Sequence, residues 1–187
     1  MKLNRKTPEH FHQMLFAPLT SLDRFEAVLQ CNGCHYRTLD GLAPQVRRLA
    51  NDLEGRLAGL EGALAFEEAF LFPRVRQAGH QHQLLALAGH RPALRLWLEQ
   101  ALHLLAALQR ADAASSPRGA SCHPVQPASE ALWDALAETI PELNQRLNRY
   151  LQAVESSYLP LLRRVLTAAP ATRARPQPQT LALAAGY

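Results

Sequence analysis

Phe66-Glu67-Glu68-Ala69-Phe70-Leu71-Phe72-Pro73 occurs twice in this chain, the second time in the altered form Val154-Glu155-Ser156-Ser157-Tyr158-Leu159-Pro160. Both stretches place an acidic residue within an apolar helical pattern and end in Leu-Phe-Pro or Leu-Pro. A carboxylate on the buried side of a helix is costly unless it is paired with another group or bound to a metal. Two helices that share this feature predict a helical bundle with a polar site in its core.

Length and composition predict a single all-α domain. The chain has 187 residues, and its aromatic content is only 6%. Leucine and alanine dominate while runs of β-branched residues are lacking, which favours helices over strands. The formal charge is +4, but the cations are spread over both ends of the chain and over helix faces. We therefore expect no nucleic-acid partner.

The same reading predicts a cytoplasmic protein. No apolar run reaches the roughly 18 residues of a membrane-spanning helix, so we expect no membrane partner. The basic start is followed by polar residues and not by the apolar core of a signal peptide. In the cytoplasm the three cysteines would be reduced thiols.

Apolar residues recur in steps of three and four along four segments, which predicts an up-down-up-down four-helix bundle over residues 20–168. Residues 1–19 are polar and contain prolines, and they are expected to form an N-terminal arm. Residues 169–187 are rich in proline, arginine and glutamine, and they are expected to form a disordered tail.

Turn-forming residues predict where the bundle reverses direction. Asn51-Asp52 is predicted as the first turn and Ala78-Gly79 as the second, while residues 111–128 form a long loop before the fourth helix. Pro141 is predicted to break that last helix.

Four ionisable residues are predicted to lie at one level of this bundle: His35, Glu67, His90 and Glu155. Antiparallel neighbours meet at positions equidistant from their shared turn, and each successive pair of these residues is centred on a predicted turn or loop. Imidazole and carboxylate groups that project inward at one level predict a transition-metal site. The alternative is that each residue is an ordinary hydrogen-bonded core residue or a half-exposed flank residue.

The quoted segments resemble the hemerythrin-like, or HHE cation-binding, family. In that family the second and fourth helices carry His-Phe-x-x-Glu-Glu-x-x-Leu-Phe-Pro or a variant, and the first and third helices each contribute an inward His. Here residues 67–73 match the second-helix phrase, Cys34-His35-Tyr36 is similar to the first-helix ligand segment, and Gly89-His90-Arg91 is similar to the third. The resemblance spans about residues 20–168 and implies a four-helix bundle that binds non-haem iron.

The chain also departs from the family pattern. The positions that carry His in the second and fourth helices are Ala63 and Tyr150, and the position that matches Glu67 in the fourth helix is Val154. By resemblance the remaining metal ligands would be His35, Glu67, His90 and, with a one-residue offset, Glu155. This reduced set implies a mononuclear or dinuclear iron site, a zinc site, or the loss of metal.

Cys31-Asn32-Gly33-Cys34-His35 matches C-x-x-C-H, the attachment motif of c-type haem. In a helix Cys31 would lie one turn from His35, so its thiolate is a second candidate ligand for zinc or iron. Two semi-buried structural thiols are the alternative reading. Tyr150 on the inner stripe is either a hydrogen-bond donor to a bound ligand or core filling.

Three functions are compatible with these observations. The first is a metal-binding bundle that senses or handles iron, O₂ or NO, with a diatomic ligand at an open coordination position and no catalytic activity expected. The second is a metal-free regulatory bundle that binds a protein partner, with Glu67 paired inside the core. The third is a haem protein that uses Cys31, Cys34 and His35.

Overall fold

The computed structural model describes residues 7–30, 37–38, 41–42, 44–115 and 127–167. Its helical elements in chain order are α1 (Thr7–Phe16), α2 (Leu19–Gln30), α3 (Pro44–Phe66), the π-helical turn η2 (Glu67–Leu71), α4 (Phe72–Gln77), α5 (Gln81–Ser115), α6 (Pro127–Ala153), the π-helical turn η3 (Val154–Tyr158) and α7 (Leu159–Thr167). Strands β1 (Arg37–Thr38) and β2 (Gly41–Leu42) form a short antiparallel pair.

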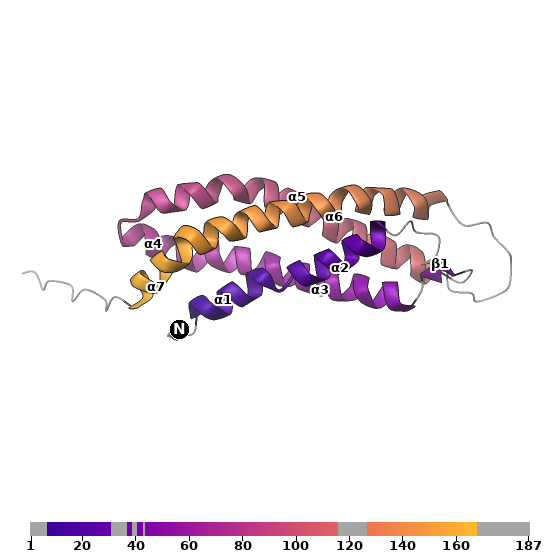
Figure 1. Ribbon diagram of the computed structural model, residues 1–187, viewed down its shortest axis with the longest axis horizontal. Coiled ribbons are helices and arrows are strands. Elements are labelled where there is room, and N and C mark those ends of the chain that lie inside the picture. The colour runs from indigo at the N-terminus through magenta and orange to yellow at the C-terminus, as the bar shows by residue number, and fades with distance from the viewer. Residues whose placement is uncertain (1–6, 31–36, 39–40, 43, 116–126, 168–187) are drawn as a thin grey trace, which may run out of the picture.

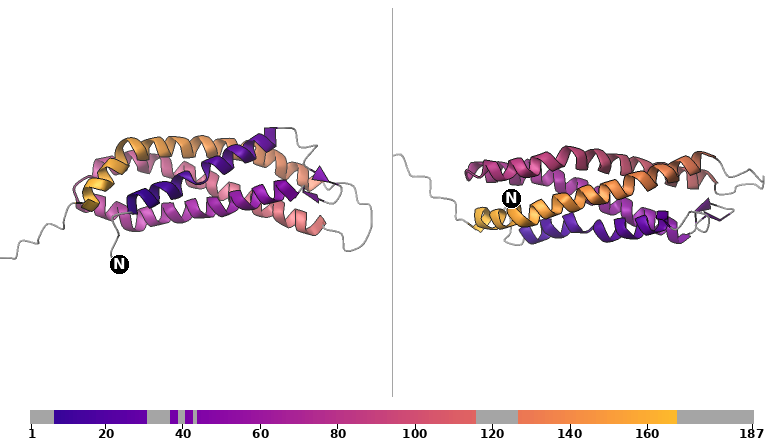
Figure 2. Two further views of the ribbon diagram at one scale, coloured as in Figure 1. Left: turned by 60° about the horizontal axis from the view of Figure 1, so that its bottom comes forward. Right: turned by 45° about the horizontal axis from the view of Figure 1, so that its top comes forward.

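Long helical rods packed side by side make up the molecule (Figures 1 and 2). The elements α3, η2 and α4 follow one another without a gap and form one rod, and α6, η3 and α7 form another. Helix α2 contacts α3 and α6, and α5 contacts the same two helices, so these four close a ring around a shared core. The predicted all-helical bundle is therefore confirmed. Within the described residues, no helix is both long and apolar enough to span a membrane.

The core stripe of α5 follows a strict alternation of three and four residues, the pattern of a helix in a bundle. Its buried members are Leu84, Leu87, Arg91, Leu94, Leu98, Ala101, Leu105 and Leu108. A single charged side chain, Arg91, therefore belongs to an otherwise apolar stripe. This stripe faces buried leucines of α3 and α6.

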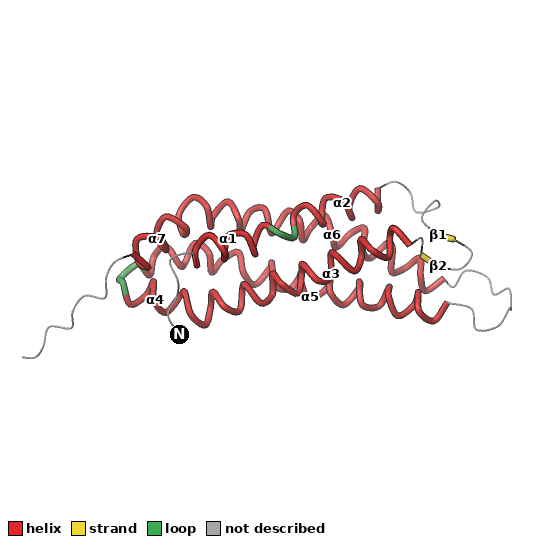
Figure 3. Tube along the Cα trace, turned by 90° about the horizontal axis from the view of Figure 1, so that it is seen from below, coloured by secondary structure: helices red, strands yellow, loops and turns green. Residues whose placement is uncertain are grey.

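The N-terminal segment differs from the predicted arm. Residues 7–16 form helix α1, which packs against α3 and α7. Phe11 and Leu15 are fully buried in the main core, at positions four residues apart on one helix face. The polar residues between them and the proline that follows hid this short amphipathic helix in the sequence. A short turn at Ala17 and Pro18 joins α1 to α2 (Figure 3).

Two of the predicted interruptions are wrong. Asn51 and Asp52 lie inside α3, which runs unbroken from Pro44 to Phe66, and Asp52 accepts hydrogen bonds from Ser21 of α2 at 2.6 Å and from Arg56 at 2.9 Å. Helix α6 continues through Pro141. In both places the tertiary packing of a long amphipathic helix outweighs a local tendency to end it.

The predicted turn at Ala78-Gly79 is confirmed. Helix α4 ends at Gln77, and Gly79 has φ = +82°, a left-handed conformation that suits glycine. The His80 amide N–H donates to the Val75 carbonyl and the Gly79 N–H donates to the Arg76 carbonyl, so the turn satisfies the last carbonyls of the helix. This turn sets the register between α3 and α5.

The repeated phrase has a matching structural repeat. In η2 the amide N–H of Phe72 donates to the Glu67 carbonyl, and in η3 the N–H of Leu159 donates to the Val154 carbonyl. Both bonds span five residues and not four, so each turn holds one residue more than an α-helical turn. Each turn ends two residues before a proline, Pro73 or Pro160, which lacks an amide N–H for the regular ladder.

Candidate functional site

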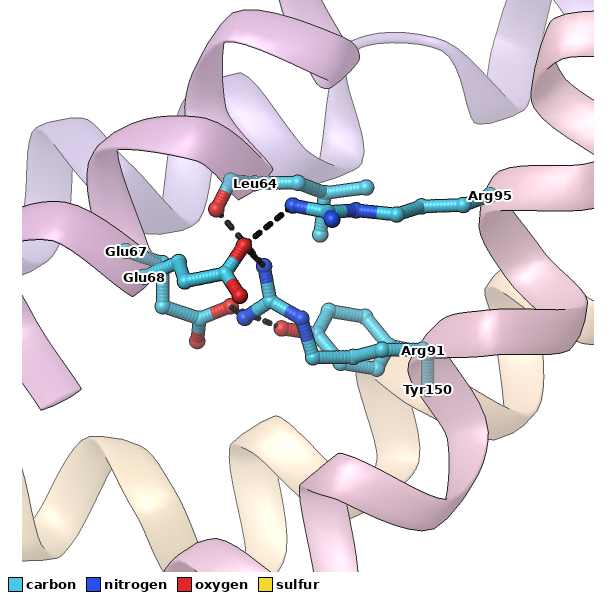
Figure 4. Close-up of polar contacts among 6 residues, drawn as sticks. All are labelled: Leu64, Glu67, Glu68, Arg91, Arg95 and Tyr150. Atoms are coloured by element: carbon cyan, nitrogen blue, oxygen red, sulfur yellow. Dashed lines mark hydrogen bonds and ion pairs between the residues drawn. The ribbon is translucent and has the colours of Figure 1, made fainter.

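Glu67 is the buried acid at the centre of the bundle. It is the first residue of η2, and its side chain is 0% exposed. Its position on the apolar stripe of the α3–η2–α4 rod directs the carboxylate at α5 and α6. Figure 4 shows the groups that meet there.

Arg91 of α5 provides the positive charge that pairs with Glu67. Its Nη1 lies 2.5 Å from Glu67 Oε2, and its Nη2 donates to the Leu64 carbonyl oxygen at 2.7 Å. The guanidinium carbon also lies 4.7 Å from the centre of the Phe72 ring, in a cation–π contact. The Arg91 side chain is only 7% exposed, so the ion pair is effectively buried.

Two tyrosines of the α6–η3–α7 rod complete the cluster. The Tyr150 hydroxyl donates a hydrogen bond to Glu67 Oε2, the same oxygen that Arg91 binds (Figure 4). The ring of Tyr158 packs edge-on against Phe72 with ring centres 5.9 Å apart. Both tyrosines are 0% exposed. We call Glu67, Arg91, Tyr150 and Tyr158 the central cluster.

Burial controls the protonation of this cluster. Loss of hydration raises the pKa of Glu67 to about 7, against the opposing effects of the Tyr150 hydrogen bond and the Arg91 charge. Burial also raises the pKa of Tyr150 and Tyr158 well above the ordinary value, and the negative charge of Glu67 adds to both shifts. Both phenols therefore stay protonated at neutral pH and act as hydrogen-bonding groups.

A second ion pair lies at the surface next to the central cluster. Arg95, one turn after Arg91 on α5, donates to the carboxylate of Glu68, and both side chains are about half-exposed. Arg91 Nη2 lies 3.8 Å from the same Glu68 carboxylate. The two consecutive glutamates of the repeated phrase thus pair with two arginines that lie on one face of α5.

His90 does not lie where the sequence placed it. It is exposed on α5, and the next residue, Arg91, occupies the core position opposite Glu67. Glu67 and Arg91 each lie 12 residues from Gly79, the residue at the centre of the turn. The predicted register differs from the observed one by a single residue. That residue decides the outcome, because Arg91 is buried and His90 is exposed. The strict three–four alternation of the α5 stripe was the sequence signal that identifies Arg91.

Glu155 is also outside the central cluster. Its side chain is 52% exposed and pairs with His12 Nε2 of α1 at 3.2 Å. The equivalent core position of the second phrase is held by Val154, which is 0% exposed. The structure thus brings together Glu67 and Tyr150 of the predicted site residues, and it leaves His90 and Glu155 apart from them.

The remaining predicted ligands, Cys31, Cys34 and His35, lie outside the described residues. The C-x-x-C-H match and the first-helix histidine therefore stay predictions.

The groups of the central cluster do not fit a metal ion. Glu67 is paired through Oε2 with a guanidinium at 2.5 Å, whose positive charge would repel a divalent cation at that place. Ala63 and Val154, which stand where the hemerythrin-like resemblance expects ligands, are buried apolar side chains. Within the part of the chain that the structure describes, no three His, Cys, Asp or Glu residues come together as a metal site.

Comparison with known proteins finds no family model, no curated protein and no solved structure that matches this chain.

Proposed function

We propose that this chain is a hemerythrin-like, up-down-up-down bundle in which Arg91 takes the place of a metal, and that it acts as a regulatory bundle that binds a protein partner. The observation that carries the proposal is the buried Arg91–Glu67 pair at 2.5 Å. A guanidinium provides the positive charge and the directed hydrogen bonds that a buried carboxylate needs. Glu67 is thereby compensated within the chain itself.

A hollow on the α3–α5 face supports the partner-binding part of the proposal. It has a volume of about 220 Å³ and is lined by Glu61, Leu64, Ala65, Arg95, Leu98 and Glu99. Leu64 and Leu98 are buried beneath it, while the two glutamates are exposed. An apolar floor between two carboxylates suits a lysine or arginine side chain, because its stem is apolar and its head is cationic.

The pattern of cross-links along this face explains why the hollow is acidic. Glu54, Glu61 and Glu68 recur every seven residues on the side of α3 and η2 that faces α5. Gln109 donates to Glu54 at 2.6 Å, and Arg95 donates to Glu68, so both ends of this row are cross-linked to α5. Among the described residues, neither Glu61 nor the nearby Glu99 of α5 has a hydrogen bond or ion pair. Glu61 in the middle of the row and Glu99 on α5 therefore offer two carboxylates to a partner.

Metal analysis combined with an absorption spectrum tests the proposal that Arg91 takes the place of a metal. The full chain would be purified anaerobically from a host supplied with iron and haem. We expect no stoichiometric metal and no chromophore. One or two irons per chain, with charge-transfer bands and no Soret band, would overturn the proposal in favour of the iron, O₂ or NO hypothesis. A Soret band would favour the haem hypothesis instead.

A titration with N-acetyl-L-arginine amide, followed by NMR of the isotope-labelled full chain, tests the partner surface. We expect the backbone amide signals of residues 61–65 and 95–99 to shift. The Glu61→Gln/Glu99→Gln double variant should abolish the shifts, whereas Glu138→Gln, at an exposed position of α6, should leave them unchanged. Equal shifts in all three proteins would show that the hollow is not a site for a basic side chain.

A further inference from the structure

Two oxygen atoms of the central cluster lack a hydrogen-bond partner among the described residues. They are Glu67 Oε1 and the hydroxyl oxygen of Tyr158. Both side chains are 0% exposed, so bulk water does not reach either oxygen. Buried polar atoms are almost always hydrogen-bonded in folded proteins, to protein groups or to internal water. These two oxygens therefore need an explanation that the protein groups around them do not provide.

The two oxygens belong to one polar region of the core. Phe72 contacts both Tyr158, at 5.9 Å between ring centres, and the Arg91 guanidinium, at 4.7 Å from its ring centre. The charges of Glu67 and Arg91 both act on the ionisation of the Tyr158 hydroxyl, so these groups lie within electrostatic range of one another. Glu67 begins η2, and Tyr158 ends η3. Each π-helical turn thus contributes one unpartnered oxygen to the same region.

The chemistry of the two oxygens defines what joins them. A carboxylate oxygen accepts hydrogen bonds, and a tyrosine hydroxyl both donates one and accepts others. A single group that serves both oxygens would donate to Glu67 Oε1 and exchange a second hydrogen bond with Tyr158. The smallest molecule with this capacity is water, the usual partner of buried polar groups that protein atoms leave unpaired.

We infer that a single internal water molecule bridges Glu67 Oε1 and the Tyr158 hydroxyl, as a fifth member of the central cluster. In this arrangement Glu67 Oε2 binds Arg91 and Tyr150, and Oε1 binds the water. The water in turn connects the carboxylate to η3. The two π-helical turns are then joined by a hydrogen-bonded bridge across the core.

A high-resolution crystal structure of the full chain tests this inference, with data collected at the absorption edges of iron and zinc. We expect a peak without anomalous signal at hydrogen-bonding distance, about 2.5–3.0 Å, from both oxygens. Direct contact between Oε1 and the Tyr158 hydroxyl, or the absence of a peak, would overturn the water bridge and leave the proposed function standing. An anomalous peak at that place would identify a metal and overturn both.

Two matched tyrosine variants provide an independent check. Tyr158→Phe removes one of the two groups that hold the water, so its electron density should disappear. Tyr150→Phe removes a donor to Oε2 and leaves Oε1 and Tyr158 in place, so the water should remain. A water that persists in Tyr158→Phe would contradict the bridge. If a variant does not crystallise, the map of the unaltered chain still decides the question.

Discussion

Arg91 and Glu67 stabilise the core as a pair, because a buried charge is tolerated when its partner is present and is costly when it is not. Arg91 is 7% exposed and Glu67 is 0% exposed, so neither charge is hydrated after its partner is removed. We expect Arg91→Met to lower the free energy of unfolding by about 3–5 kcal/mol. Urea denaturation measures this loss.

The matched control for this prediction is Arg95→Met, one turn away on α5. Arg95 also pairs with a glutamate, but its side chain is 43% exposed, and we expect a loss of about 1 kcal/mol or less. The double variant Arg91→Met/Glu67→Met removes both buried charges and should recover much of the stability. A double variant as unstable as Arg91→Met alone would contradict the assignment of the pair.

The protonation of Glu67 predicts a pH dependence of stability. Its pKa rises from 4.5 to about 7 on folding, so between these pH values the folded chain binds more protons than the unfolded chain. The contribution of Glu67 to the free energy of unfolding is complete below pH 4.5 and is lost as the pH rises through 7. We expect the unfolding free energy of the unaltered chain, relative to Glu67→Gln, to fall by about 3 kcal/mol over this window. A difference that grows with pH would contradict the raised pKa of Glu67 and leave the Arg91–Glu67 pair in place.

The site could be predicted from the sequence in part. Glu67 was identified as buried because an acidic residue stood on an apolar stripe, and Tyr150 was recognised on the inner face of the fourth helix. Arg91 was missed because histidine is the more familiar metal ligand and its neighbour His90 fitted the expected register. A shift of one residue turns a helix face by about 100°. Turn positions predicted from the sequence are uncertain by a residue, so they cannot distinguish His90 from Arg91 as the residue that faces the core.

The extra residue in each π-helical turn predicts where the chain tolerates the deletion of one residue. Each holds one extra residue, so deletion of a residue from η2 should return the rod to a regular α-helix without rotating α4. Phe70 suits this test, because it is 53% exposed. We expect deletion of Phe70, combined with Pro73→Ala to restore the missing amide N–H, to give a folded protein by circular dichroism and thermal melting.

Deletion of Gly62 provides the contrast. Gly62 is also exposed, but it lies in the regular part of α3. Its removal rotates every later residue of the rod by about 100° and moves Glu67 out of the core. We expect this variant to lose its cooperative thermal transition. Similar behaviour of the two deletions would contradict the role given to η2.

Helix α1 makes a second prediction at this scale. Phe11 is 2% exposed and belongs to the main core. Phe11→Ala should therefore lower the unfolding free energy by about 3–5 kcal/mol, as expected for a large buried side chain. Gln13→Ala, at an exposed position of the same helix, should change it by about 0.5 kcal/mol or less. Equal effects of the two substitutions in urea denaturation would show that α1 does not pack against the core.

The bundle and its turn at Ala78-Gly79 could be predicted from the sequence, whereas the turn expected at Asn51-Asp52 was wrong. Four stripes of leucine specify which faces are buried, and this information is spread over many residues, so single errors do little harm. A turn depends on two or three residues. Asn51 and Asp52 have the composition of a turn, but the bonds from Ser21 and Arg56 to Asp52 hold them within α3. The Ser21 contact depends on another helix and leaves no local signal, whereas the Arg56 pair, four residues along the same helix, is a local one.

The thermal stability of the whole molecule should not depend on metal chelators. A bundle held by its own ion pair gains no stability from a bound ion, so its melting temperature should not change after exhaustive treatment with EDTA and an iron chelator. The control is Arg91→Met in the same treatment, which reports whether a metal occupies the centre once the guanidinium is removed. A fall of several degrees for the unaltered chain would contradict metal independence.

The pairing of Arg91 with Glu67 has a consequence for how the protein is produced. Because this cation is the Arg91 side chain, every synthesised chain contains one cation for its one buried Glu67 carboxylate. If Arg91 takes the place of a metal as proposed, the core needs no metal-insertion step, and iron starvation does not remove its cation. The fraction of the chain that is folded should then not change while the iron supply of the cell rises and falls.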